Sequence, residues 1–385
     1  MKKKILFVVT YFDCGGINRS LQNILNCIDT DLYDVDVFGM VPDGMFANLY
    51  KNCHVLTRHR LLAVLMSRYS QQRGLRKLMC LIIKVLNKVS YGYFGRCIKK
   101  RSAQKLLKNG YDTVVAFSEG APTSFVAYMN HSNSVAWIHC DYNSYKLLNG
   151  FKNEGSLYSH FKHIVCVANY PRQQFLLCYP EFASRTTTIY NIHDVDMMKS
   201  LAACGVEESF SKGGYHIVSI GRLDPVKRLS LVPIIAKKLI DAGCRFDWFI
   251  IGPKGGSANE YEKLMNNISE LGVGDVVHYI GEKDNPYSYI SRADILVNTS
   301  ISEACPYVIN EAKILHTPVV CTDFGSASEF VDDGINGFIC PIEQMPITIT
   351  RYLKDVKLQN LIKNSISTFN YDNKVLLEQV YMVLG

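Results

Sequence analysis

The chain has 385 residues, 48% of them hydrophobic and 20% charged, a composition typical of a globular protein that argues against a disordered one. This length is large for one hydrophobic core, so we expect two domains. The 13 cysteines are odd in number and form no Cys-x-x-Cys pair, which argues against a disulfide framework or a zinc site and favours a reducing compartment. No apolar run in the sequence approaches the roughly 20 residues that a membrane-spanning helix needs.

Positive charge is concentrated in one segment of the chain. There are 42 Lys and Arg residues against 35 Asp and Glu, a net charge of +7. Residues 44–111 hold 15 of these cations and no acidic residue, which leaves a net charge of −8 on the rest of the chain. We therefore expect one basic surface and not a basic molecule.

The amino terminus predicts a buried strand that leads into a ligand-binding turn. Residues 4–10 are aliphatic and β-branched, and the apolar run is too short for a signal peptide. Gly15 and Gly16 follow, ahead of a helical stretch. A second glycine lets the backbone approach an anion closely, although an ordinary strand-to-helix turn also favours paired glycines. The Asp-x-Asp in the next strand, residues 33–40, fits strand alternation better than a metal site.

Residues 51–108 combine apolar segments with all 15 of these cations. Apolar side chains recur there at helical spacing, at Leu78, Leu81, Ile82, Val85 and Leu86. A basic, apolar helix without acids suits the headgroup layer of an anionic membrane, which is the interpretation we favour. One alternative is an ordinary surface helix whose apolar face packs into the core. The other is a nucleic-acid surface, against which the few, clustered aromatic residues argue.

Two further strands of the first half end in polar residues. Residues 111–117 lead into Glu119, and residues 134–139 end at His139. In doubly wound sheets, ligands bind at the carboxyl ends of the strands, so both side chains are expected on the same rim as the glycine pair. A single histidine is often structural, but this position makes His139 a candidate for ligand binding.

A loose segment, residues 198–215, separates this half from a second series of alternating strands and helices. Residues 215–220 form a strand that ends in GRLDPVKR, with Arg222 and Lys227 in the turn before the next helix. Two cations at a strand end can hold a diphosphate and stabilise the charge that develops on it as it departs, and solvated loop charges are the alternative. A later strand, residues 276–280, ends beside Glu282.

Residues 298–337 carry the densest pattern in the chain. They follow an apolar strand and contain Glu303 and Glu311 with Pro306 between them. Because Pro is favoured in the first turn of a helix, we expect Glu303 in the loop after the strand and Glu311 in the second helical turn. Free backbone N–H groups at the helix start suit a phosphate-bearing ligand.

These motifs resemble the carboxyl-terminal half of retaining glycosyltransferases of the GT-B fold. GRLDPVKR, SEACPYVINEA and DDGINGF, all within residues 221–338, are similar in particular to glycosyltransferase family 4, the glycosyl transferases group 1 enzymes. The first half resembles the family only in layout. Two departures stand out: residues 304–307 replace a loop that is often glycine-containing, and Ile192 stands where the family has proline.

The resemblance implies a role for each matching position of the second half. Glu311 should bond the ribose hydroxyls of a nucleotide, and Glu303 should contact the donor sugar or stabilise positive charge on its anomeric carbon. Arg222 and Lys227 should bind the diphosphate in place of a metal ion. The remaining donor contacts in this half are expected from the helix start and from the end of the preceding strand, at Pro306, Tyr307, Val308 and Glu282.

In the first half, the resemblance implies donor contacts by Gly15, Gly16 and Glu119, with His139 beside the donor sugar. It also implies an α/β fold of two Rossmann-like domains that face one another across a cleft. We expect an acceptor-side domain over residues 1–195, a nucleotide-sugar-binding domain over residues 196–369, and a final helix over residues 370–385 that packs back on the first domain.

The implied activity is retaining transfer of a sugar from a nucleoside-diphosphate sugar, with UDP-hexose or UDP-N-acetylhexosamine expected and with no cofactor or metal. The acceptor would be lipid-linked or a polysaccharide, as in capsule, O-antigen or glycolipid assembly. The basic residues 51–108 would hold the protein on the cytoplasmic face of an anionic membrane, and no nucleic acid would be bound. The alternatives are a nucleotide-sugar epimerase of the same fold and a non-catalytic protein that binds membrane or polymer.

Overall fold

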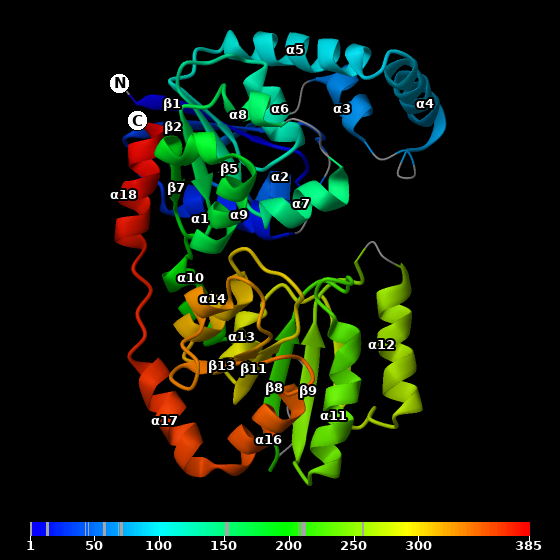
Figure 1. Cartoon of the computed structure of the whole chain (residues 1–385), viewed down its shortest axis with the longest axis vertical. Helices are drawn as coiled ribbons and strands as arrows, with labels where there is room; N and C mark the ends of the chain where they lie inside the picture. The colour runs from blue at the N-terminus through cyan, green and yellow to red at the C-terminus, as the bar shows by residue number, and fades with distance from the viewer. Residues whose placement is uncertain are drawn as a thin grey trace. The chain divides into compact units, whose positions relative to one another are not determined.

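The structure is a computed structural model that describes residues 2–12, 15–42, 44, 46–56, 59–67, 69, 72–150, 154–206, 208, 213–255 and 258–385. The chain divides into two compact units, residues 1–193 with 372–385 and residues 194–371 (Figure 1). Over the described residues, each unit holds one sheet in which every strand pair is parallel. The predicted α/β architecture with two Rossmann-like sheets is confirmed.

The sheet of the first unit has seven strands among the described residues, in the order β3-β2-β1-β4-β5-β6-β7. These strands are β1 (Lys3–Val9), β2 (Tyr33–Gly39), β3 (His54–Leu56), β4 (Thr113–Ala116), β5 (Ser134–Ile138), β6 (His163–Cys166) and β7 (Thr186–Thr188). Asp36 in β2 is buried and accepts a hydrogen bond of 2.6 Å from the Tyr111 hydroxyl.

The helices of the first unit connect these strands and form its outer layers. They are α1 (Gly16–Cys27), α2 (Phe46–Leu49), α3 (Arg60–Met66), α4 (Gly74–Val89), α5 (Tyr93–Leu107), α6 (Ala121–Ala127), α7 (Tyr142–Asn149), α8 (Gly155–Tyr158), α9 (Asn169–Cys178), the 3₁₀ helix η2 (Pro180–Arg185) and α18 (Asn373–Leu384). The last of these, α18, comes from the end of the chain and packs on the first unit. Its Tyr381 ring stacks on Tyr33 at 5.3 Å, and the backbone oxygen of Leu384 accepts a hydrogen bond of 2.6 Å from Thr113.

The described part of the second unit has six strands in the order β10-β9-β8-β11-β12-β13. They are β8 (Tyr215–Ile220), β9 (Phe246–Ile251), β10 (Val277–Gly281), β11 (Ile295–Asn298), β12 (Val319–Cys321) and β13 (Gly337–Ile339). Its helices are α10 (Val195–Ala202), η3 (Leu229–Leu231), α11 (Val232–Asp241), α12 (Ala258–Glu270), α13 (Tyr287–Ile290), α14 (Tyr307–Ile314), α15 (Ala327–Phe330), α16 (Met345–Lys354) and α17 (Val356–Ser367).

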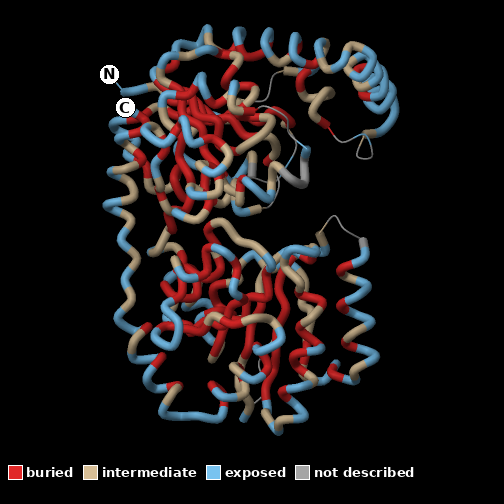
Figure 2. The backbone as a smooth tube through the Cα atoms, in the orientation of Figure 1, coloured by how far each residue is buried: buried red, intermediate tan, exposed pale blue. Residues whose placement is uncertain are grey.

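Burial explains why the central strands read as continuous apolar runs. A parallel sheet is covered by helices on both faces, so its strands have no solvent-facing side. Every residue of β4, β5, β9 and β11 is accordingly buried (Figure 2). Ser219 is a polar residue of the second core whose hydroxyl is fully hydrogen-bonded: it donates to the backbone oxygen of Val297 at 2.7 Å and accepts from the Trp248 indole at 3.0 Å.

No helix within the described ranges has both the length and the apolar character needed to cross a bilayer.

The carboxyl ends of β8 and β9 approach each other so closely that only glycine fits. Gly252 has a φ of 147°, and a Cβ built on it would lie 2.0 Å from the backbone oxygen of Gly221. Gly252 also donates to the backbone oxygen of Gly281 at 2.8 Å, so three strand ends meet through backbone atoms alone. This close backbone packing fixes the positions of the strand ends from which the loops after β8 and β9 begin.

We predict that Gly252→Ala destabilises the second unit by about 2 kcal/mol or more, because both the backbone conformation and the space disfavour a side chain. Denaturant unfolding followed by circular dichroism measures the change. Gly274→Ala is the matched control: its Cβ would meet its nearest neighbour, Ile268 Cγ2, at 3.6 Å, an ordinary contact distance. An unfolding midpoint of Gly252→Ala equal to that of the control would contradict the prediction.

Candidate active site

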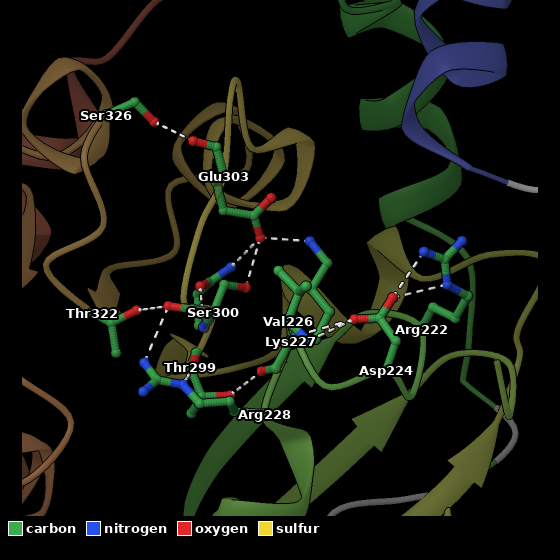
Figure 3. Close-up of polar contacts among 11 residues, drawn as sticks. Arg222, Asp224, Val226, Lys227, Arg228, Thr299, Ser300, Glu303, Thr322 and Ser326 are labelled. Carbon is green, nitrogen blue, oxygen red and sulfur yellow. Dashed lines mark hydrogen bonds and ion pairs between the residues drawn. The ribbon is translucent and has the colours of Figure 1, made fainter. Parts of the chain in front are cut away.

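Two loops of the second unit meet at the carboxyl ends of the adjacent parallel strands β8 and β11. The loop after β8 carries Arg222 and Lys227, and the loop after β11 carries Glu303. Lys227 Nζ lies 2.5 Å from Glu303 Oε1 (Figure 3). The structure thus brings together two of the residues that the sequence placed 76 positions apart.

The Glu303 carboxylate is held through one of its two oxygens. Besides Lys227, the hydroxyl of Ser300 donates to Oε1 at 2.7 Å and the amide of Asn298 donates at 3.4 Å. Over the described part of the chain, Oε2 accepts no hydrogen bond, and Figure 3 shows it pointing away from these donors. The backbone of Glu303 is fixed as well, because Ser326 donates to its carbonyl at 2.8 Å. The side chain is therefore oriented, with one oxygen available to a ligand.

Further hydrogen bonds tie the two loops to each other. The backbone N–H of Ile301 donates to the oxygen of Val226 at 2.7 Å, and Thr299 Oγ1 donates to the oxygen of Lys227 at 2.7 Å. Arg228 contributes two more, from Nε to the oxygen of Thr299 at 2.8 Å and from its terminal nitrogen to that of Ser300 at 3.3 Å. These bonds hold the positions of Lys227 and Glu303 relative to one another.

Arg222 has a separate partner. Its guanidinium pairs with Asp224 at 2.8 Å and 2.9 Å through two nitrogens, while the other Asp224 oxygen accepts from the backbone N–H groups of Val226 and Lys227. Asp224 therefore shapes the turn and aligns the arginine at once. Half of the Arg222 side chain is exposed, so it can contact a further anion without leaving Asp224.

Helix α14 places the second glutamate. Pro306 is its N-cap, with φ −71° and ψ 108°, so the helix begins one residue later than the sequence suggested, at Tyr307. Proline has no backbone N–H and here adopts a non-helical ψ, which makes it the residue before the first turn. The N-cap residue Pro306 makes no side-chain capping hydrogen bond, and Val308 is buried in the first turn. Glu311 is buried one turn further on, where the Tyr287 hydroxyl donates to it at 3.4 Å.

The remaining residue predicted for this half, Glu282, is exposed just beyond the end of β10. Among the described residues, no group of three His, Cys, Asp or Glu side chains is arranged to hold a metal ion.

The predicted residues of the first unit lie at the ends of β1, β4 and β5. Helix α1 starts at Gly16, with Gly15 as its N-cap, and a Cβ on Gly15 would meet no atom within 4 Å. Asp13 and Cys14 in the same turn lie outside the described residues. A Glu119 oxygen accepts the backbone N–H of His139 at 3.1 Å, so these two predicted residues are neighbours.

Burial shifts the pKa values of both residues. It raises the pKa of Glu119 above its usual value, although the N–H of His139 opposes the shift. Burial lowers the pKa of His139 to about 3, so its ring is neutral at physiological pH. The ring atom Nε2 is buried and has no hydrogen-bond partner among the described residues. A neutral imidazole nitrogen of this kind can donate to or accept from a ligand hydroxyl.

Sequence reasoning missed five residues of the site: Asp224, Arg228, Tyr287, Asn298 and Ser300. Arg228 stood within the quoted GRLDPVKR motif, but its φ of 50° and its reach to the opposite loop have no sequence signature. Asn298 ends a predicted strand, a position that could have marked it as a capping group. Tyr287 had no such signal, because only the fold brings α13 to α14.

Comparison with known proteins supports the motif-based assignment. Residues 206–367 match the family described as Glycosyl transferases group 1. This match covers most of the second unit, residues 194–371. The chain is 27% identical over 186 residues to a Campylobacter jejuni N-acetylgalactosamine-N,N'-diacetylbacillosaminyl-diphospho-undecaprenol 4-alpha-N-acetylgalactosaminyltransferase, a match covering 47% of each chain. It spans about a third to a half of the length of this and other curated relatives.

Solved structures extend the likeness to the whole fold. The structure of Anabaena HepE in complex with UDP and glucose matches with a TM-score of 0.72 and 18% identity, covering 99% of both chains. A Rickettsia africae glycosyltransferase matches with a TM-score of 0.74 and 17% identity, covering 100% of this chain and 98% of the other. At these identities the matches establish the GT-B fold.

The buried histidines predict a pH dependence of stability. Burial lowers the pKa of both His139 and His193 from 6.5 to about 3. The unfolded chain therefore binds more protons than the folded one between these values, so the free energy of unfolding should fall as pH decreases from 6.5 toward about 3. Urea unfolding at about pH 7 and about pH 5 measures this loss, and His139→Gln should show a smaller loss than the unsubstituted protein. An equal loss in the two proteins would contradict the burial of a neutral His139.

Proposed function

We propose that this protein is a retaining glycosyltransferase that transfers a sugar from a nucleoside-diphosphate sugar without a metal ion. The observation that carries the proposal is the Lys227–Glu303 pair at the ends of β8 and β11, within the part of the chain that matches the glycosyl transferases group 1 family. A cation, an oriented carboxylate and the start of helix α14 there provide the groups that a sugar diphosphate needs.

Each end of the donor has a candidate partner. The free Oε2 of Glu303 accepts a hydroxyl of the donor sugar or faces positive charge on its anomeric carbon. Glu311, buried one turn inside α14, bonds the ribose hydroxyls. Between them, the backbone N–H groups at Tyr307 and Val308 meet the diphosphate, where the partial positive charge of the helix start favours anions.

The cations of the β8 loop act on the leaving group. When the bond between sugar and diphosphate breaks, negative charge accumulates on the departing oxygen. Lys227 and Arg222 stabilise that charge electrostatically, and both are already held in place by Glu303 and Asp224. In the usual description of this family, the acceptor attacks from the same face and gives its proton to the leaving phosphate, so no separate base is needed.

For the first unit, we propose that Gly15, Gly16 and Glu119 line the donor site and that the neutral His139 ring bonds the donor sugar. The backbone at Glu282 is assigned to the nucleotide base. UDP is the proposed nucleotide, because UDP is bound in the HepE structure named above.

A lipid-linked or polysaccharide acceptor at the cytoplasmic membrane face is the proposed second substrate. Support comes from the cationic segment 44–111 and from the Campylobacter relative, whose name specifies a diphospho-undecaprenol acceptor. A Bacillus subtilis relative, 24% identical over 243 residues, is named for a poly(glycerol-phosphate) acceptor. A nucleotide-sugar epimerase would leave the cationic segment without a role.

A panel of nucleotide sugars tests the donor. We expect slow release of UDP from one UDP-sugar even without acceptor. Glu311→Ala should raise the KM for that donor about tenfold or more, because it removes charge-assisted hydrogen bonds to ribose. Glu329→Ala, which removes a carboxylate from α15 of the same unit, is the control and should leave the KM unchanged. If Glu311→Ala leaves the KM unaltered, the ribose assignment is wrong.

Metal independence is tested with a chelator. Because Arg222 and Lys227 supply the positive charge that a divalent ion would otherwise supply, we expect full activity in EDTA. Lys227→Met should lower kcat about a hundredfold or more, and added magnesium should not restore it. Loss of activity in EDTA with recovery on adding a divalent ion would assign the leaving-group charge to a metal instead.

A further inference from the structure

Helix α4 exposes the apolar side that an ordinary surface helix buries. Its exposed aliphatic side chains recur every three or four residues and so share one side of the helix. These side chains are Leu75, Leu78, Ile82, Val85, Leu86 and Val89, and between 45% and 74% of each one's surface is exposed. The residues that α4 does bury, Cys80 and Ile83, lie on another side and pack toward α3 and α5. For this helix, the alternative that its apolar face packs into the core is wrong.

The neighbouring helix α5 shows that this exposure is specific. It lies in the same acid-free segment and carries five cations to the four of α4, yet its apolar residues Ile98, Ala103 and Leu106 are buried. Helix α5 is therefore an ordinary surface helix with cations on its outer face. The exposed blue tube of α4 in Figure 2 consists of apolar as well as charged residues.

Three lysines of α4 lie on a third side of the helix, apart from its exposed apolar side and its buried side. Lys77, Lys84 and Lys88 are spaced by seven and four residues, so they form a row beside the apolar side and not within it. At the turn into α5, Tyr91 and Tyr93 are largely exposed, and their amphipathic rings suit a boundary between water and an apolar phase.

We propose that α4 lies in the plane of an anionic bilayer, with its apolar side at the boundary of the acyl chains and its lysine row among the lipid phosphates. Lysine stems are long enough to reach the headgroups while the aliphatic residues stay below them. This proposal builds on the proposed function, since it places the protein where a lipid-linked acceptor would be found, but membrane binding itself requires no catalysis.

Charge decides between a bilayer and a second copy of this chain. If two copies paired through α4, their cations would be brought together with no acidic residue anywhere in residues 44–111 to compensate them. An anionic membrane supplies the missing negative charge and an apolar layer together. The surface is complementary to such a bilayer in both respects.

Vesicle sedimentation of the full chain tests the proposal. Vesicles of phosphatidylcholine with phosphatidylglycerol should bind the protein, and pure phosphatidylcholine vesicles should bind it weakly. The triple variant Leu78→Ser, Ile82→Ser, Leu86→Ser should lower the partition coefficient about tenfold or more, because three aliphatic groups no longer enter the membrane. Ile347→Ser, Val356→Ser, Leu361→Ser is the matched control, exposed to a similar degree on α16 and α17, and should bind like the unsubstituted protein.

The lysine row makes a separate contribution. Lys77→Gln, Lys84→Gln, Lys88→Gln should weaken binding to anionic vesicles and leave binding to neutral ones unchanged. Raising the salt should weaken binding of the unsubstituted protein but leave an apolar remainder that the serine variant lacks. Equal melting temperatures of all variants would show that the substituted side chains are not part of the core.

Fluorescence locates the helix directly. The native residues Trp137 and Trp248 are fully buried, so Ile82→Trp adds a reporter at the apolar side, and Ile347→Trp adds one elsewhere. On adding anionic vesicles, the emission of the first should shift to shorter wavelength and be quenched by brominated lipid, while that of the second should not change.

Three results would overturn the proposal. The first is that the unsubstituted protein does not bind vesicles, and the second is that the α4 serine variant binds them as well as the unsubstituted protein does. The third is that the protein is a dimer in solution and that this variant is a monomer. Failure of the proposed function would appear differently, as no release of UDP from any UDP-sugar. Glu311→Ala should keep its vesicle binding, and the α4 variant should keep its release of UDP.

Discussion

The ion pair between Lys227 and Glu303 depends on a single property of the second sheet, the adjacency of β8 and β11. In the order β10-β9-β8-β11-β12-β13, the chain winds outward in one direction and then returns to continue on the other side of β8. At this switch point the two following loops diverge, and ligands of doubly wound sheets bind there. The first unit repeats the arrangement, because β1 and β4 are adjacent and are followed by the glycine turn and by Glu119.

Charge compensation within the site explains how it can be stable before a ligand arrives. Lys227 is about one quarter exposed and Glu303 about one tenth, so either charge left alone would be poorly solvated. In the ion pair, each side chain compensates the charge of the other. In the proposed donor complex, the diphosphate would share Lys227, while Ser300 and Asn298 would still hold Oε1 of Glu303. Neither charge is then left without a partner at any stage.

The sequence predicted where Glu303 and Glu311 lie in the fold better than it predicted the hydrogen bonds between the two loops. Strands and helices followed from apolar runs and periodicity, and the loop position of Glu303 and the helical position of Glu311 followed from the strand end and Pro306. The cross-loop role of Arg228 could not be foreseen, since it depends on a left-handed backbone and on contacts across the sheet. Periodicity could not settle α4 either, because an amphipathic pattern looks the same whether its apolar side faces a core or a membrane.

The uneven charge of the chain and the exposed side of α4 have complementary effects. The 15 cations of residues 44–111 are attracted to an anionic surface, whereas the rest of the chain, at −8, is repelled by it. This difference selects one orientation at long range but cannot set a depth, since electrostatic attraction falls off within a Debye length in salt. Aliphatic side chains act only on contact and are insensitive to salt. In the proposed membrane complex, electrostatics would therefore select which surface approaches the membrane, and the apolar side of α4 would set how far it enters.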